Sequence, residues 1–252
     1  LLGSVLLHTL GLRGLLLLCA VCFAVSALWE RTLPIPHAPA ARSGRRLPPK
    51  ALFLRARPLL RLAMVLALLN LAVVPAFTVG VPLLIVRYYA FSDTALAVTQ
   101  SAMSAGGLLG GVLAGALAKR LSLRRGTAAL WCITAVCALL GLAVLPCVPA
   151  AAGYIAIAAL AFCMMVAAAL FQILLFTAIQ AHAPTGQTGR FMSLITVCAC
   201  LTQPAGQAAF GHLYGRFAAL PSAVLFAAAA ASVFINLAAS QIFKKAVSFT
   251  KS

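Results

Sequence analysis

Uncharged intervals of nearly constant length constrain this chain more than any other feature. A helix that crosses the hydrocarbon core of a membrane needs about 20 apolar residues, at a rise of 1.5 Å each. Four intervals of 25 to 27 uncharged residues fit one crossing apiece, so each predicts a membrane-spanning helix. They lie between Arg61 and Arg87, Asp93 and Lys119, Arg190 and Arg216, and Arg216 and Lys244.

A fifth interval, between Arg125 and Arg190, holds 64 uncharged residues and is too long for one crossing. Pro146 and Pro149 divide it, which predicts two spans joined by a short hairpin. Leu12–Trp29 predicts a further helix, which makes seven spans in all.

Composition agrees with a membrane protein. Of the 252 residues, 64% are hydrophobic and only 8% are charged, whereas a soluble domain carries about 25% charged residues. We therefore expect an all-α, polytopic membrane helix bundle. The chain opens with Leu1 and "LLGSVLLHTL", which is typical of the end of an earlier helix, so we expect a fragment whose N-terminal part is missing.

The cations indicate an orientation. If the spans alternate in direction, one side of the membrane receives the segment Arg31–Arg61, the cluster Lys119–Arg125, Arg190 and the end of the chain, which together hold 16 of the 19 Lys and Arg residues. Because cytoplasmic loops carry an excess of Lys and Arg, we expect the central loop and C-terminus to be cytoplasmic, in the inner (plasma) membrane. Cations spread over loops do not favour a nucleic-acid partner, which calls for one basic surface.

A glycine pattern ends in a basic cluster within the span after Asp93. Gly107, Gly111 and Gly115 recur every four residues, and Gly106, Gly110, Ala114 and Ala118 repeat the spacing on the adjoining stripe. Helices approach closely in lipid through such small residues. Two interpretations stand: a sliding surface attached to a charged loop, or plain helix packing with cytoplasmic anchoring. The basic cluster is Lys119, Arg120, Arg124 and Arg125.

Four stretches carry a resemblance to the major facilitator superfamily. "GVLAGALAKRLSLRR" resembles its loop motif, in which a Gly-x-Leu-Ala-Gly run precedes an acid, Arg, Gly and a basic pair. "GLRGLLLLCAVCFAVSALWERTLPIP", "LLNLAVVPAFTVGVPLLI" and "GQTGRFMSLITVCACLTQPAGQAAFGHLYG" resemble the sixth, seventh and eleventh helices of macrolide-efflux-type members. Lys119 and Ser122 depart from the motif, where an acid and Gly are expected, and this argues against a charge-relay role for the loop.

The resemblance implies a division of the chain into four parts. Residues 1–30 would end the N-terminal helical half, with a remnant of helix five followed by helix six. Residues 31–57 would form the central cytoplasmic loop, 58–243 the C-terminal six-helix domain, and 244–252 a cytoplasmic tail. It also implies alternating access, in which two halves rock about a site near the bilayer midplane.

Polar and aromatic residues inside the spans are candidates for that site. Buried amides in lipid need partners, so they face protein, water or substrate. Hydrogen bonding between helices therefore remains the alternative to substrate contact for each of them. The candidates for the substrate cavity are Asn70, Phe77, Thr78, Gln172, Phe176, Thr196, Gln203 and Gln207.

The chain contains only two acidic residues, Glu30 and Asp93, and both lie at the ends of spans. A proton carrier would thus have to come from the missing half or from elsewhere. We expect no enzyme activity, cofactor or metal site, because no paired carboxylates, nucleophile–base pair, phosphate loop or metal-ligand spacing occurs.

The resulting hypothesis is a part of a secondary active transporter that exports lipophilic drugs such as macrolides in exchange for protons. Transport of another solute class, such as a nutrient or a lipid, is one alternative. A truncated membrane protein that does not transport is another.

Overall fold

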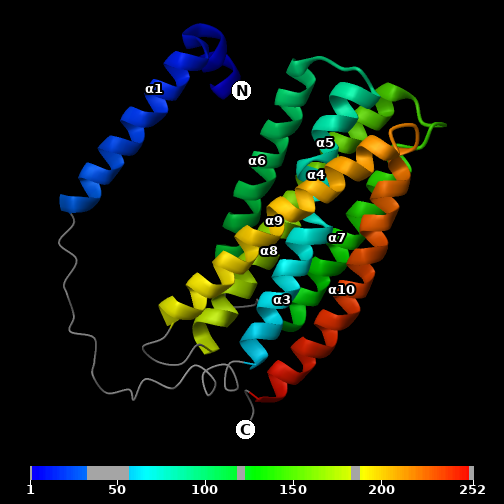
Figure 1. Ribbon diagram of the computed structural model, residues 1–252. Coiled ribbons are helices and arrows are strands. Elements are labelled where there is room, and N and C mark those ends of the chain that lie inside the picture. Colours follow the sequence, from blue (N-terminus) through cyan, green and yellow to red (C-terminus); the bar gives the residue numbers. More distant parts are fainter. Residues whose placement is uncertain (1, 33–56, 118–122, 183–187, 250–252) are drawn as a thin grey trace. The chain divides into compact units, whose positions relative to one another are not determined.

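The computed structural model describes residues 2–32, 57–117, 123–182 and 188–249, and each secondary-structure element within them is a helix (Figure 1). The expected all-α, polytopic fold is therefore confirmed. The chain divides into two compact units, Leu1–Arg45 and Arg46–Ser252.

The first unit contains one helix, α1 (Leu2–Thr32), which is broken at Gly11. Gly11 has a φ of 64°, in the region that side chains rarely adopt, so the break falls where the sequence supplies a glycine. It separates the opening residues from the predicted helix Leu12–Trp29. The stretch Thr9–Thr32 is long and apolar enough to cross a membrane.

In the second unit, the first predicted span is a chain of four short helical segments. Pro75 lacks an N–H group, so the carbonyl of Leu71 has no partner one turn on and the regular helix breaks there. The Tyr214 hydroxyl donates a hydrogen bond of 3.0 Å to the Ala76 carbonyl and ties the interrupted span to a neighbouring helix. The segments are α3 (Arg57–Ala72), α4 (Val74–Thr78), α5 (Gly80–Leu83) and the π-helix η1 (Leu84–Tyr88).

Five longer helices complete this unit: α6 (Asp93–Ala116), α7 (Leu123–Ala143), α8 (Ala150–His182), α9 (Thr188–Arg216) and α10 (Pro221–Phe249). The expected hairpin between two spans is confirmed, because α7 and α8 are separated by residues 144–149. The helix α10 does not end before Lys244 but continues to Phe249; its apolar part is Pro221–Ile242.

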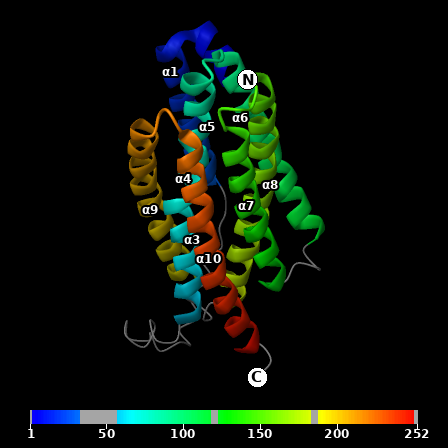
Figure 2. The same ribbon diagram turned by 90° about the vertical axis from the view of Figure 1, so that its right-hand side faces the viewer.

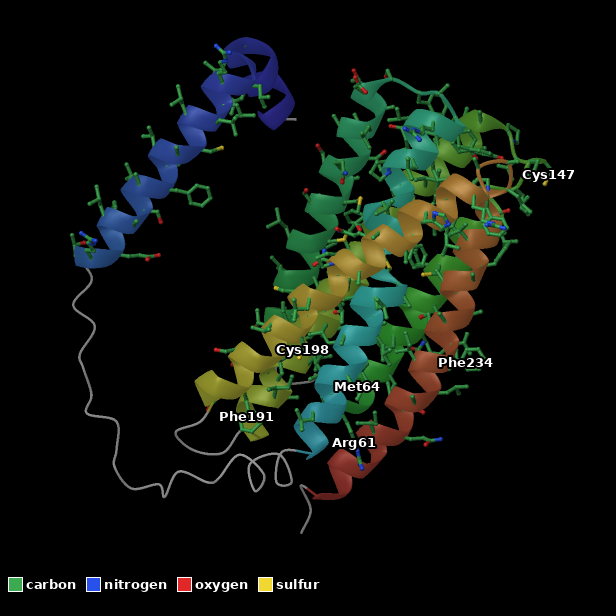
Figure 3. All side chains as sticks on the ribbon, viewed as in Figure 1. Arg61, Met64, Cys147, Phe191, Cys198 and Phe234 are labelled. Atoms are coloured by element: carbon green, nitrogen blue, oxygen red, sulfur yellow. The ribbon has the colours of Figure 1, made fainter. Side chains whose placement is uncertain are left out.

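Six of the helical stretches in the described part of the chain are long and apolar enough to cross a membrane. They include α1 and the interrupted span Leu60–Tyr88, whereas α9 is a long helix that is not among them. In Figure 3, Arg61 and Cys147 lie at opposite ends of the second unit. Phe234, 73% exposed, projects from the outer surface of α10, as a side chain that faces lipid does.

The closest helix packing is between α6 and α8, which lie side by side in Figures 1 and 2. A Cβ atom added to Gly110 would lie 2.7 Å from the carbonyl oxygen of Val166, and one added to Gly106 would overlap the carbonyl oxygen of Phe162. These two glycines let the helix backbones touch, as small residues do in membranes. A Cβ at Gly111 or Gly115 would meet no atom within 4 Å.

A buried polar cluster joins α7 to α10. The Asn236 amide donates to the Leu130 carbonyl at 3.0 Å and to the Thr134 hydroxyl at 2.6 Å, and the Thr134 and Ser232 hydroxyls lie 2.7 Å apart. Hydrogen bonds between side chains hold helices together where no water is available. Asn236 Oδ1 is buried and has no partner among the described residues.

Candidate functional site

A cavity of about 340 Å³ opens between α3, α7, α8 and α9, a size that suits a small molecule. Five of the eight predicted cavity residues line it. They come from three helices that are distant in sequence: Asn70, Gln172, Phe176, Thr196 and Gln203.

The cavity lies deep within the spans. The helices α3 and α9 begin, and α8 ends, at the same end of the second unit (Figure 1). Asn70, Gln172 and Thr196 are eight to thirteen residues from that end, which places them about 12–20 Å from it along their helices. The cavity therefore lies well inside these helices and not at their ends.

The amide side chains at the cavity have no hydrogen-bond partner among the described residues. This holds for Asn70 and Gln203, which are half-buried, and for Gln172, which is exposed at the cavity's open side. By contrast, Asn236 in the same unit bonds across two helices. Within the described residues, these three amides therefore do not form the hydrogen bonds between helices that were the alternative to substrate contact.

A close contact between α9 and the break in the first span brings two of these amides together. A Cβ added to Gly206 would lie 2.6 Å from Pro75 Cγ and 2.9 Å from the carbonyl oxygen of Asn70. Gly206 therefore allows the backbone of α9 to pack against the break at Pro75. At this break the Leu71 carbonyl has no N–H donor one helical turn on. Gln203, one turn before Gly206, reaches the cavity that Asn70 lines.

Three other predicted cavity residues do not line this cavity. Phe77 is 2% exposed and lies in the hydrophobic core, Thr78 is exposed, and Gln207 is half-buried elsewhere on α9. The break at Pro75 turns the segment after it, so Phe77 and Thr78 do not continue the face of Asn70.

The glycine and basic motif is only partly described. Of the predicted stripe, a Cβ added to Gly107 would lie 3.9 Å from the Met165 methyl group, and one added to Gly111 or Gly115 would meet no atom within 4 Å. The adjoining Gly106 and Gly110 make the backbone contact. The role of the first stripe stays a prediction. Lys119 and Arg120 lie outside the described residues. Arg124 and Arg125 belong to the first turn of α7, but the structure does not describe their side chains.

Most of the wall is apolar, and sequence reasoning did not identify its aliphatic residues. Residues such as Leu66, Ile133 and Met164 resemble any membrane-embedded side chain in sequence, so no signal marked them. Phe171 is 3% exposed and lies with Phe176 beside Gln172. The further lining residues are Leu69, Val73, Val74, Ala168, Ala199 and Cys200.

The site carries no formal charge, since its lining includes no Asp, Glu, Lys or Arg. The two acidic residues lie at helix ends, Glu30 near the end of α1 and Asp93 in the first turn of α6. Within the described residues, no three His, Cys, Asp or Glu side chains gather where they could hold a metal ion. The arrangement can bind a neutral or weakly polar molecule through apolar surface and a few amides.

Comparison with known protein families identifies the family of this chain. The sequence model of the Major Facilitator Superfamily matches residues 1–207, which include α1, the interrupted span and most of α9. Neither curated proteins nor solved structures gave a match. With its apolar helices and its match over most of its length, this chain is a multi-pass membrane protein that belongs to the Major Facilitator Superfamily of secondary transporters.

Proposed function

We propose that the chain forms part of an exporter of lipophilic compounds, such as macrolide-like drugs, and that the α3–α7–α8–α9 cavity is its contribution to the substrate site. The observation that carries this proposal is the combination of a mostly apolar wall with three amides that have no hydrogen-bond partner among the described residues. Apolar surface supplies affinity for a bulky lipophilic molecule, and a few amides can orient different compounds without demanding a fixed charge.

Sugars and phosphates fit this wall poorly. A sugar needs several hydrogen-bonding groups around its ring, and a phosphate needs cations or backbone N–H groups. The lining offers three amides, the hydroxyl of Thr196 and no cation, and it includes the rings of Phe171 and Phe176.

We further propose that transport proceeds by alternating access, with an N-terminal half of the protein closing the open side of the cavity. The coupling ion is a proton, and the carboxylate that carries it lies outside the six-helix domain. The placement of the carboxylate outside this domain is supported by Asp93, the single acidic residue in 58–243, which is at a helix start, where it stabilises the helix. Loss of efflux on addition of a protonophore tests the coupling.

Selectivity of efflux tests the site itself. Gln172→Ala and Gln203→Ala in the full-length protein should each change the relative efflux of several structurally distinct antibiotics and dyes, because each compound uses the amides differently. The assay is efflux from cells that lack their own pumps, normalised to the amount of protein in the membrane. Gln180→Ala is the matched control, since Gln180 is an exposed glutamine of α8 that does not line the cavity.

The outcomes separate binding from packing. A changed order of preference among compounds at equal abundance supports substrate contact. An equal loss for all compounds, together with lower thermal stability in detergent, would refute it and make Gln172 and Gln203 structural residues.

A further inference from the structure

A second recess, of about 460 Å³, lies away from the cavity described above. Its walls are the end of the interrupted span, the last turns of α9 and the start of α10. The candidate membrane span Leu60–Tyr88 ends at this recess, and the span Pro221–Ile242 begins there. The recess is therefore at the level where the hydrocarbon core gives way to lipid headgroups.

Arg87 is the charged residue that lines this recess, and its guanidinium has no partner in the described part of the chain. No ion pair joins it to Asp93, the single acidic residue of the second unit. A guanidinium offers five N–H donors in a planar fork that matches the oxygens of a phosphate. Arg87 is exposed at the end of the span, and a cation at this level with no counter-charge in the described part of the chain favours an external anion.

The backbone that presents Arg87 is unusual. Residues Leu84–Tyr88 form a π-helix, in which the Tyr89 amide donates to the Leu84 carbonyl at 2.9 Å, and Ala90 follows with a φ of 51°. Wide π turns recur at functional sites, and a positive φ at a residue with a side chain is strained. The wide turn places Arg87 and Tyr88 together on the recess.

Two glycines leave open space on the part of the recess that α9 contributes. Gly211 and Gly215, one helical turn apart on α9, line the recess, and a Cβ added to either would meet no atom within 4 Å. The Tyr214 hydroxyl between them is occupied by the Ala76 carbonyl, so it forms a fixed part of the wall. Exposed apolar side chains adjoin the lining residues in sequence: Val86, Phe217 and Leu220.

We propose that this recess binds the headgroup of an anionic phospholipid. Arg87 holds the phosphate through paired N–H···O contacts, the glycine wall of α9 leaves room for the headgroup, and the acyl chains lie along the exposed apolar side chains nearby. The ligand is part of the bilayer rather than a transported solute. The proposal is independent of the efflux substrate, and its test reads lipid retention alone.

The experiment uses the full-length protein in nanodiscs that contain phosphatidylglycerol and phosphatidylcholine in equal amounts. Native mass spectrometry after release from the discs measures which lipid stays bound. We expect the wild type to retain phosphatidylglycerol in preference, and Arg87→Gln to reduce this preference about tenfold, the effect of one lost charged hydrogen bond. Arg216→Gln is the matched control. Arg216 is an exposed arginine at the end of α9 next to the recess, but it does not line the recess.

A steric variant provides a second test if Arg87→Gln folds poorly. Gly211→Leu keeps Arg87 and fills open space, so it should abolish retention without disturbing the helix packing. The proposal would be overturned if the wild type retained both lipids equally, or if Arg87→Gln and Gly211→Leu left retention unchanged. It would also be overturned if Arg216→Gln lost as much retention as Arg87→Gln. Displacement of the lipid by millimolar inorganic phosphate would also overturn it, since the site would then take a free anion.

Discussion

Gly110→Ala should destabilise the protein by opening the contact between α6 and α8. The new Cβ would lie 2.7 Å from the Val166 carbonyl oxygen and 2.8 Å from Ala169 Cβ. Ordinary contact begins at 3.4 Å, so α6 must move away by about 0.7 Å at this crossing. Both obstacles are backbone or a Cβ, and neither can rotate away.

The cost follows from that displacement. A gap of about 0.5–1 Å loses a quarter to a half of the dispersion energy between the atoms that line it. Helices associate in lipid through such close packing, so we expect a loss of about 1–3 kcal/mol in unfolding free energy, the range for overpacked interiors.

Gly111→Ala is the matched control, one residue along the same helix. Its Cβ would meet nothing within 4 Å, so the change should be neutral or stabilising by up to about 1 kcal/mol through helix propensity. The measurement is unfolding of the full-length protein in mixed micelles, followed by circular dichroism. Equal destabilisation by the two variants, or no effect of Gly110→Ala, would show that the backbones of α6 and α8 do not touch at Gly110.

Three further predictions concern other parts of the chain. Tyr214→Phe should lower the unfolding free energy by about 1–3 kcal/mol, because the buried Ala76 carbonyl loses its donor; an unchanged thermal midpoint would contradict this. Thr134→Val removes the hydroxyl that links α7 to α10 and should cost about 1–2 kcal/mol in the same assay, whereas Ser240→Ala, at an exposed hydroxyl of α10, should cost little. Cysteines placed at Ser43 and Ser122 should react only with a reagent that has entered the cell, and labelling from outside would reverse the proposed orientation.

The spacing of charges was sufficient to predict the succession of helices. Whether a segment forms a long apolar helix depends on its own length and polarity, so the uncharged intervals and the two prolines before α8 located the helices and the hairpin without reference to any neighbour. The interval between Arg190 and Arg216 is the exception as a span, because α9 is a long helix but is not among the six stretches apolar enough to cross. The family could be recognised in the same way, because each stretch that resembles it is continuous in the sequence. The polar residues inside the predicted spans also included Thr196 and Gln203 of α9, which line the cavity.

Which face of each helix meets a neighbour was decided by the tertiary structure. Gly106–Gly110 and Gly107–Gly111 have the same spacing and differ only by the rotation of one residue about the helix axis. The first pair touches the backbone of α8, whereas a Cβ added to Gly107 would reach only the end of the Met165 side chain and one added to Gly111 would meet no atom within 4 Å. Likewise Gln203 and Gln207 are one turn apart on α9, but Gln203 alone lines the cavity. Sequence periodicity shows which residues share one face of a helix. The direction in which that face points depends on how the helix rotates and crosses its neighbours, and these are set by contacts between helices. For α9, one such contact is that of Gly206 with Pro75 at the break in the first span.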